Sequence, residues 1–168
     1  MEIWDLYDRN RNVIGEHIRG EELPENGYHL VVHVWIKNKN GEYLISQRSK
    51  DRASNPLKWE CQGGSVLKGE KSIDGAIREV KEEVGINLFA SDGKVLFTHT
   101  RDNINGVRFN DIMDVWLFEY NGDVDLTKAT TKEVAQVKWL NKNEIQEMCD
   151  KKEFVGTLNY FFDKVFDK

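Results

Sequence analysis

The feature that most constrains this 168-residue chain is a glycine-rich loop that leads directly into an acidic helix. Residues 64–86 read Gly-Ser-Val-Leu-Lys-Gly-Glu, seven further residues, and then Arg-Glu-Val-Lys-Glu-Glu-Val-Gly-Ile. We expect the helix to begin near Ser72, because serine is a favourable N-cap residue. It should end at Gly85, because glycine adopts the left-handed C-terminal conformation without strain. The stretch therefore predicts one loop and one helix with a defined start and end.

The predicted helix has separate apolar and acidic faces. At about 100° per residue, one arc collects the side chains suited to a core, which are Ile73, Ala76, Ile77, Val80 and Val84. Glu79, Glu82 and Glu83 fall in a second arc, where neighbouring like charges cost roughly 0.2–0.5 kcal/mol per pair. Such a face is often simply solvated, but a divalent cation makes the same crowding favourable. Mg²⁺ prefers oxygen ligands and is commonly shared between carboxylates and substrate phosphates, so the pattern indicates a site for metal and phosphate.

Every fixed position of residues 64–86 resembles the signature of the Nudix hydrolases, which is Gly, five residues, Glu, seven residues, and Arg-Glu-apolar-any-Glu-Glu-any-Gly-apolar. The resemblance implies an α/β fold of the α+β type, a Nudix-like α/β/α sandwich with a mixed β-sheet. It also implies a hydrolase that depends on Mg²⁺ or Mn²⁺. The expected reaction is cleavage of a phosphoanhydride bond in a nucleoside diphosphate linked to another moiety.

The resemblance further implies roles for residues of the helix. Glu82 and Glu83 would be metal ligands, and Glu79 would be either a ligand or the general base that activates water. Arg78 would orient Glu79 through an ion pair, although an arginine four residues before Glu82 is also typical of a solvated helix face. The expected catalytic set is therefore Glu79, Arg78 and Glu82.

Two residues of the preceding loop belong to the same expected site. Glu70 would support the first ligands or reach a second metal, and the backbone carbonyl of Gly63 would be a further ligand. A glycine is physically reasonable there, because the backbone approaches an ion closely where no Cβ intervenes. Many members of the family read Phe-Pro-Gly-Gly before the signature, whereas this chain reads Cys-Gln-Gly-Gly at residues 61–64.

A downstream carboxylate is the last expected metal ligand. In the branch of the family that cleanses nucleotide pools, an acidic residue lies six positions before a tryptophan. Here Glu133 lies six positions before Trp139. A solvated glutamate at a strand edge would have the same sequence, and Asp111 and Asp114 on the preceding predicted strand are alternatives.

Several basic residues outside the signature are candidates for substrate contact. Arg48, Arg101 and Arg108 are expected to contact phosphate or base, on residue type alone, since no motif includes them. His29 and His33 are four residues apart in a predicted buried strand, so their side chains point to the same face. They form either part of a site or, as is commoner, hydrogen-bonded core residues.

Composition limits the classes of partner. The net charge of −5 argues against nonspecific nucleic-acid binding, which needs a basic surface. No apolar run approaches the ~18 residues of a membrane span, no secretory segment opens the chain, and the two cysteines have no zinc or redox spacing. We therefore expect a cytoplasmic protein that acts on a small-molecule diphosphate and has neither nucleic-acid nor membrane partners.

The chain divides into two expected parts. Residues 1–27 are predicted to be an N-terminal β-hairpin extension, with strands at 3–7 and 13–18. Residues 28–168 are predicted to be the Nudix domain. The N-terminal part is similar to that of isopentenyl-diphosphate isomerases, which share the Nudix fold.

Turn signals predict the elements of the second part. Asn-Gly pairs at 40–41 and 105–106 are typical of tight hairpin turns, and they separate the strands expected at 29–36, 43–48, 95–101 and 107–119. A further strand is expected at 134–140, followed by a short helix that Asn141 and Glu144 cap. A last helix is predicted from Phe154, with an apolar stripe typical of a core and less often of a homodimer contact.

Two other functions are compatible with parts of the sequence. Isopentenyl-diphosphate isomerase has a catalytic cysteine immediately before the first glycine of the signature and a histidine ligand after it. This chain has Gly63 and Ser65 at those positions, and Cys61 lies two places earlier. A non-catalytic, ligand-sensing Nudix domain usually loses the carboxylates and is attached to a DNA-binding domain, whereas this chain keeps the carboxylates.

Overall fold

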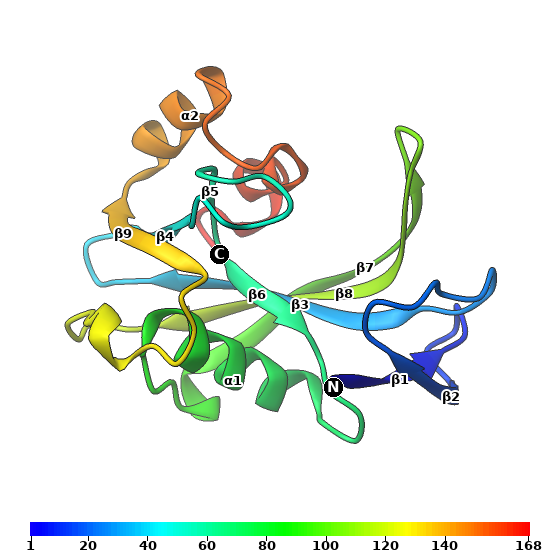
Figure 1. Cartoon of the computed structure of the whole chain (residues 1–168). Helices are drawn as coiled ribbons and strands as arrows, with labels where there is room; N and C mark the ends of the chain where they lie inside the picture. The colour runs from blue at the N-terminus through cyan, green and yellow to red at the C-terminus, as the bar shows by residue number, and fades with distance from the viewer.

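The apolar segment His29–Lys37 forms β3, the central strand of the sheet, in a computed structural model that describes residues 1–168 (Figure 1). β3 pairs in parallel with β8 (Val107–Glu119) along its whole length. Its other edge pairs antiparallel with β6 (Gln62–Ser65), and β7 (Gly93–Ile104) pairs antiparallel with β8. Parallel and antiparallel pairs share one sheet, so the sheet is mixed, as the sequence predicts.

The remaining strands diverge from β3 after the tight turn at Gly41, where φ is +77°. β4 (Tyr43–Arg48) meets β3 only at the pair Lys37–Tyr43 and runs mainly alongside β9 (Val134–Leu140). Its other neighbour is the short strand β5 (Trp59–Glu60). The sheet therefore opens between β3 and β4, and β6 occupies the edge of β3 at this opening.

Helical segments cover both faces of the sheet (Figure 1). Helix α1 (Ser72–Val84) packs on one face, where its Val80 and Val84 join a core cluster with alternate residues of β3. Helix α2 (Lys142–Asp150) and the C-terminal segment lie over the other face, around Trp35. Three short 3₁₀ turns complete the elements, at Ala90–Asp92, Leu126–Lys128 and Gly156–Leu158. No helix is both long and apolar enough to cross a membrane.

The first two strands, β1 (Ile3–Tyr7) and β2 (Val13–Ile18), form a separate two-stranded sheet with the predicted bounds. This hairpin is tied to the large sheet by specific contacts. Trp4 stacks on His29 with a ring-centroid distance of 4.3 Å, and Arg11 forms a 2.7 Å ion pair with Asp114. Because these contacts join β1 and the hairpin turn to β3 and β8, they fix the hairpin near the glycine loop.

The helix caps test the sequence predictions. Gly85 ends α1 with φ of +73°, and Asn141 and Glu144 form the complete capping box of α2, so both predictions are confirmed. Ser72 is not the N-cap of α1: Lys71 occupies that position, and Ser72 is the first helical residue. The hydroxyl of Ser72 instead accepts a hydrogen bond from Nε1 of Trp116.

The predicted last helix is wrong. The segment forms the 3₁₀ turn at Gly156–Leu158 and a single π-helical turn at Phe161–Val165. Phe154 lies instead in a parallel bridge with Trp59, whose carbonyl accepts a hydrogen bond from the Val155 amide. This bridge holds the backbone extended where the helix was expected to begin. The apolar stripe nevertheless packs into the core of its own chain, with Leu158, Phe161 and Val165 buried.

Candidate active site

The glycine pair that ends β6 lets the backbone pass between β3 and α1. A Cβ at Gly63, where φ is +155°, would lie 2.1 Å from the carbonyl oxygen of Val32. A Cβ at Gly64 would lie 2.5 Å from the carboxylate carbon of Glu79. Only glycine therefore allows both the strand pairing and the close packing of the Glu79 carboxylate against the loop.

Arg78 connects helix α1 to this loop. Its Nη1 donates to Glu79 at 2.9 Å and to Glu82 at 3.1 Å, and its Nε donates to Glu70 at 2.8 Å. Its Nη2 donates to the backbone carbonyl of Ser65 at 2.9 Å. Burial opposes the charge, but the hydrogen bond that Arg78 donates to Glu70 and the charges of Glu79 and Glu70 raise the pKa of Arg78 above its ordinary value. The guanidinium therefore fixes the position of three carboxylates.

The glutamates of α1 line one cavity of about 210 Å³ together with carboxylates from distant segments. Glu79, Glu82 and Glu83 come from α1, Glu133 immediately precedes β9, and Glu2 comes from the N-terminal hairpin. No hydrophobic side chain lines the cavity, and the remaining lining residues are Arg19, Arg52, Gly63, Gly64, Ser65, Arg78 and Thr131. The fold thus collects five acidic groups around the glycine loop.

The electrostatics of this cavity show a shortage of positive charge. Glu83 is buried, and its carboxylate accepts one hydrogen bond, at 3.2 Å from the Gly63 amide. Burial and then the charge of Glu79 raise the pKa of Glu83 well above its ordinary value. Burial also raises the pKa of Glu79 to about 7, against the opposing effect of Arg78. Crowded carboxylates of this kind are stabilised by a cation.

The donor set fits a hard divalent cation. Carboxylate oxygens are the ligands that Mg²⁺ and Mn²⁺ prefer, and the cavity presents them from two segments of the main fold. No three His, Cys, Asp or Glu side chains are gathered at metal-coordinating spacing here, and Arg78 holds Glu79 and Glu82. Glu83 and Glu133 are the carboxylates of this set that Arg78 does not contact. A cation at the cavity would have Glu79, Glu82, Glu83 and Glu133 as its oxygen donors.

The structure separates the other predicted residues into near and distant groups. Gly63 lines the glutamate cavity, whereas Glu70 lies behind Arg78 and also accepts a hydrogen bond from the Leu67 amide. Asp114 binds Arg11, so it lies away from the cavity among the contacts of the hairpin.

The three candidate arginines have different environments. Arg48 forms a 2.8 Å ion pair with Glu60, and Arg101 forms two hydrogen bonds with Asp111, at 2.7 and 2.6 Å. Both arginines line a second cavity, next to the glutamates. Arg108 donates to the carbonyl of Pro24 and lines surface pockets that contain no residue of the 64–86 signature.

The two histidines of β3 are half-buried and hydrogen-bonded, and each lines a cavity: His33 lines the second cavity, and His29 lines a surface pocket beside Trp4. Nδ1 of His33 lies 2.8 Å from the hydroxyl of Tyr160, and Nδ1 of His29 lies 3.5 Å from the hydroxyl of Ser65. Burial lowers the pKa of His29 to about 4 and that of His33 to about 3. Both rings are therefore neutral at physiological pH.

Three charged residues of the glutamate cavity were not found from the sequence. Arg52 forms a 2.5 Å ion pair with Glu133, and Arg19 forms a 3.0 Å ion pair with Glu2. Arg52 follows Arg48 by four residues in a loop without a motif, while Glu2 and Arg19 reach the site only because the hairpin folds back. No local pattern identifies them.

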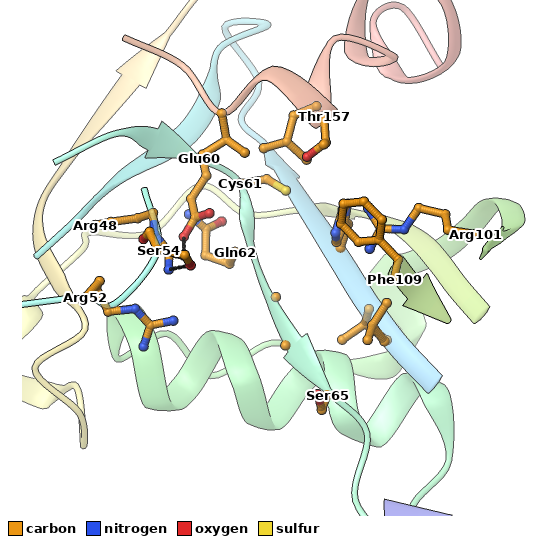
Figure 2. A pocket seen from close by; sticks show the side chains of 17 residues that line it. Arg48, Arg52, Ser54, Glu60, Cys61, Gln62, Ser65, Arg101, Phe109 and Thr157 are labelled. Carbon is orange, nitrogen blue, oxygen red and sulfur yellow. Dashed lines mark hydrogen bonds and ion pairs between the residues drawn. The ribbon is translucent and has the colours of Figure 1, made fainter. Parts of the chain in front are cut away.

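The second cavity, of about 310 Å³, adjoins the glutamates along the loop, sharing Arg52, Gly63, Gly64 and Ser65 with the first. Figure 2 shows Arg48 and Arg52 on one side of it, with Arg101 and Phe109 on the opposite side. The thiol of Cys61 lies between them, and burial raises its pKa well above the ordinary value. A phosphate chain bound at the glutamates therefore has space to extend between these arginines.

Comparison with known proteins identifies the family. The NUDIX domain model matches residues 27–160. An uncharacterised Nudix hydrolase of Listeria innocua is 39% identical over 166 residues, covering 96% of this chain and 91% of that protein. A counterpart in Listeria monocytogenes is 38% identical with the same coverage. The chain belongs to the Nudix hydrolase family, whose members hydrolyse phosphoanhydrides.

Solved structures have the same fold. A protein of Deinococcus radiodurans matches with a TM-score of 0.72 at 19% identity and covers 92% of both chains. A MutT protein from Methanosarcina mazei matches with a TM-score of 0.63 at 25% identity, over 86% of this chain and 94% of that one. A bifunctional NMN adenylyltransferase/ADP ribose pyrophosphatase of Francisella tularensis, complexed with AMP and a manganese ion, has a TM-score of 0.60 at 21% identity. It covers 86% of this chain and 43% of that one.

Proposed function

We propose that this Nudix hydrolase uses Mg²⁺ or Mn²⁺ to cleave a phosphoanhydride bond in a nucleoside diphosphate linked to another moiety. The observation that carries the proposal is the single cavity in which Glu79, Glu82 and Glu83 of α1 meet Glu133 and the glycine loop. The similar Francisella protein, whose structure contains AMP and a manganese ion, supports a divalent metal and a nucleotide substrate.

The carboxylates have distinct roles in this proposal. Glu82, Glu83 and Glu133 would hold the metal, with the backbone of Gly63 beside them, and Glu79 would serve as the general base. A bound Mg²⁺ or Mn²⁺ supplies charge neutralisation for the diphosphate oxygens. The positive charges of the surrounding arginines reduce the electrostatic repulsion between the glutamates and the substrate's phosphates.

The residues of the chain then direct the reaction. Glu79 accepts a proton from the attacking water, whose oxygen bonds to phosphorus as the bond to the bridging oxygen breaks. Arg78, at 2.9 Å from Glu79, holds that carboxylate in position, and the backbone carbonyl of Ser65 holds Arg78. Arg52 and Arg19 are the cations of the cavity placed to bind phosphate oxygens.

The test is a screen of the purified protein against nucleotide sugars, dinucleoside polyphosphates, nucleoside di- and triphosphates and coenzymes, with Mg²⁺, Mn²⁺ or chelator. Hydrolysis should require metal, and Glu82→Gln should lower kcat by about a hundredfold or more, because a charged donor is removed while the shape stays. Glu147→Gln, an exposed glutamate of α2, is the matched control. Chelator-resistant turnover, or wild-type turnover in Glu82→Gln, would contradict the proposal.

The isomerase alternative depends on a different residue. The isomerases protonate an alkene with a cysteine thiol, and Cys61 is the cysteine that lines the second cavity. Hydrolysis needs no thiol, so Cys61→Ala should leave cleavage of the phosphoanhydride bond nearly unchanged while Glu79→Gln abolishes it. Cysteine-dependent isomerisation of isopentenyl diphosphate would favour the alternative.

A further inference from the structure

A third cavity adjoins the second one, on the side away from the glutamates. Its volume is about 720 Å³, and it shares Arg101, Phe109, Val155 and Thr157 with the second cavity. The second cavity in turn shares the glycine loop with the first. A diphosphate held at the glutamates therefore has a continuous path for its other moiety, which ends in this distal cavity between β7, β8 and the C-terminal segment.

The distal cavity has the opposite chemistry to the glutamate cavity. None of its lining residues is an Asp or a Glu, although the whole chain carries a net charge of −5. Three basic side chains line it instead, from His99, Arg101 and Lys164, and three aromatic rings do so, from Phe97, Phe109 and Tyr160. The lining therefore favours a ligand that has both a negatively charged group and a flat, apolar ring.

The cations are held beside the rings. Nζ of Lys164 lies 4.7 Å from the centre of the Phe97 ring and forms no ion pair with a carboxylate. The guanidinium of Arg101 lies 4.4 Å from the centre of the Phe109 ring. Arg101 uses Nε and Nη2 to bind Asp111, which leaves Nη1 available to a ligand.

The rings themselves are positioned for stacking. Tyr160 meets Phe97 edge-on with a centroid distance of 5.2 Å, and its hydroxyl is held by His33 and by Nε1 of Trp35. Phe109 is half-buried, with its ring against Arg101 in Figure 2. Planar ligands gain favourable contact with faces and edges of this kind.

We propose that the distal cavity binds an aromatic ring together with a phosphate group attached to the same moiety, so that the substrate is a diphosphate whose remote moiety is a phosphorylated nucleoside. The proposal rests on the proposed function, because the diphosphate must lie at the glutamates for the remote moiety to reach Lys164. A neutral sugar would leave both the aromatic rings and the free ammonium group of Lys164 without a complement.

The test measures binding of three probes by calorimetry: adenosine 3′,5′-bisphosphate, AMP and ribose 5-phosphate. AMP lacks the additional phosphate, and ribose 5-phosphate lacks the ring. The bisphosphate should bind about tenfold more tightly than AMP, and AMP more tightly than ribose 5-phosphate. Lys164→Gln should abolish the preference for the bisphosphate, whereas Phe109→Leu should weaken both adenosine ligands and spare ribose 5-phosphate.

The matched control is Lys142→Gln, because Nζ of Lys142 also lies over a phenylalanine ring, that of Phe166, at 4.6 Å, and lines none of the three cavities. It should keep the wild-type preference. Equal affinity for AMP and the bisphosphate, or an unchanged preference in Lys164→Gln, would overturn the proposal. Such a result would leave metal-dependent, Glu82-dependent hydrolysis intact, so the two proposals fail separately.

Discussion

At the scale of single residues, Gly64 decides where a reactive carboxylate can lie. The Glu79 carboxylate packs against its Cα so closely that any Cβ would come within 2.5 Å of it. The side chain of Glu79 would have to turn away, and Arg78 would lose one of its three carboxylate partners. Gly64 therefore contributes to the site because its missing Cβ leaves room for the Glu79 carboxylate.

Gly64→Ala should therefore lower kcat by about a hundredfold, the order of effect produced by small misplacements of reacting groups. The melting temperature should change little, because a flexible side chain and not the backbone must move. Gly15→Ala is the control, since a Cβ at Gly15 would meet no atom within 4 Å. Steady-state kinetics and thermal melts of both variants measure this, and near-normal turnover in Gly64→Ala would show that the Glu79 position is not critical.

Because the histidines of β3 are neutral in the folded protein, we expect its free energy of unfolding to fall as the pH is lowered. The pKa of His33 is about 3 in the folded protein and about 6.5 in the unfolded chain, so the unfolded chain binds the proton first. Neutral His33 therefore contributes to the free energy of unfolding. The contribution is complete above pH 6.5 and is lost as the pH falls towards 3, at up to about 1.4 kcal/mol per pH unit. His29 adds to the decline between pH 6.5 and about 4.

Denaturant unfolding of His33→Gln between pH 7 and 4 tests this. Glutamine can still hydrogen-bond the hydroxyl of Tyr160 but does not titrate, so the free energy of unfolding should fall less steeply with acid than in the wild type. His99→Gln, at an exposed position, should keep the wild-type slope. Parallel curves for His33→Gln and wild type would mean that His33 is protonated in the folded state.

At the scale of elements, the N-terminal hairpin contributes to the site as well as to the fold. Arg19 follows β2 and lines the glutamate cavity, where its ion-pair partner is Glu2 of the same hairpin. The Arg19 side chain is 57% exposed, whereas Arg78 is largely buried among its partners, so Arg19 can turn towards a phosphate without breaking a buried network.

Arg19→Ala should raise KM several-fold with little change in kcat, because a phosphate contact far from the broken bond stabilises substrate and transition state alike. Arg9→Ala is the control in the same hairpin, since Arg9 binds Asp102 and does not line the cavity. Steady-state kinetics on the best substrate from the screen give both constants. A fall in kcat with unchanged KM would assign Arg19 to the chemical step instead.

The elements that the sequence predicted well are those with local signals. Strands β1, β2, β4 and β9 have the predicted bounds, because alternating apolar residues and Asn-Gly turns are encoded within a few positions. The C-terminal segment was mispredicted because its apolar spacing suits either a helix or a chain wrapped over Trp35. The bridge between Phe154 and Trp59 decides between them, and these residues are far apart in sequence.

At the scale of the whole molecule, the site combines a local motif with remote contributions. The 64–86 signature predicts Glu79, Glu82 and Glu83 because their spacing on one helix is a local pattern. Arg52, Arg19 and Glu2 reach the same cavity only through the packing of the hairpin and of the loop after β4. The distal cavity depends on β7, β8 and the C-terminal segment together, so no sequence pattern indicates its chemistry.

The glutamate cavity also couples metal binding to the stability of the whole chain. Glu83 is buried among like charges, with one amide as its donor, which destabilises the metal-free protein. A ligand that binds only the folded state stabilises it by about 2.7 kcal/mol at a hundred times its Kd. For a chain of this size, that corresponds to a rise of roughly 5–10 °C in melting temperature.

Thermal melts with chelator and with saturating Mg²⁺ or Mn²⁺ should show this rise in the wild type. Glu83→Gln should melt above the wild type in chelator, because the neutral amide still accepts the hydrogen bond of Gly63 without the buried charge. It should gain less from metal, because a charged donor is missing. Glu147→Gln, on the surface of α2, should match the wild type in both conditions. If Glu83→Gln instead melts lower in chelator and gains as much from metal, Glu83 is a structural carboxylate and the metal lies elsewhere in the cavity.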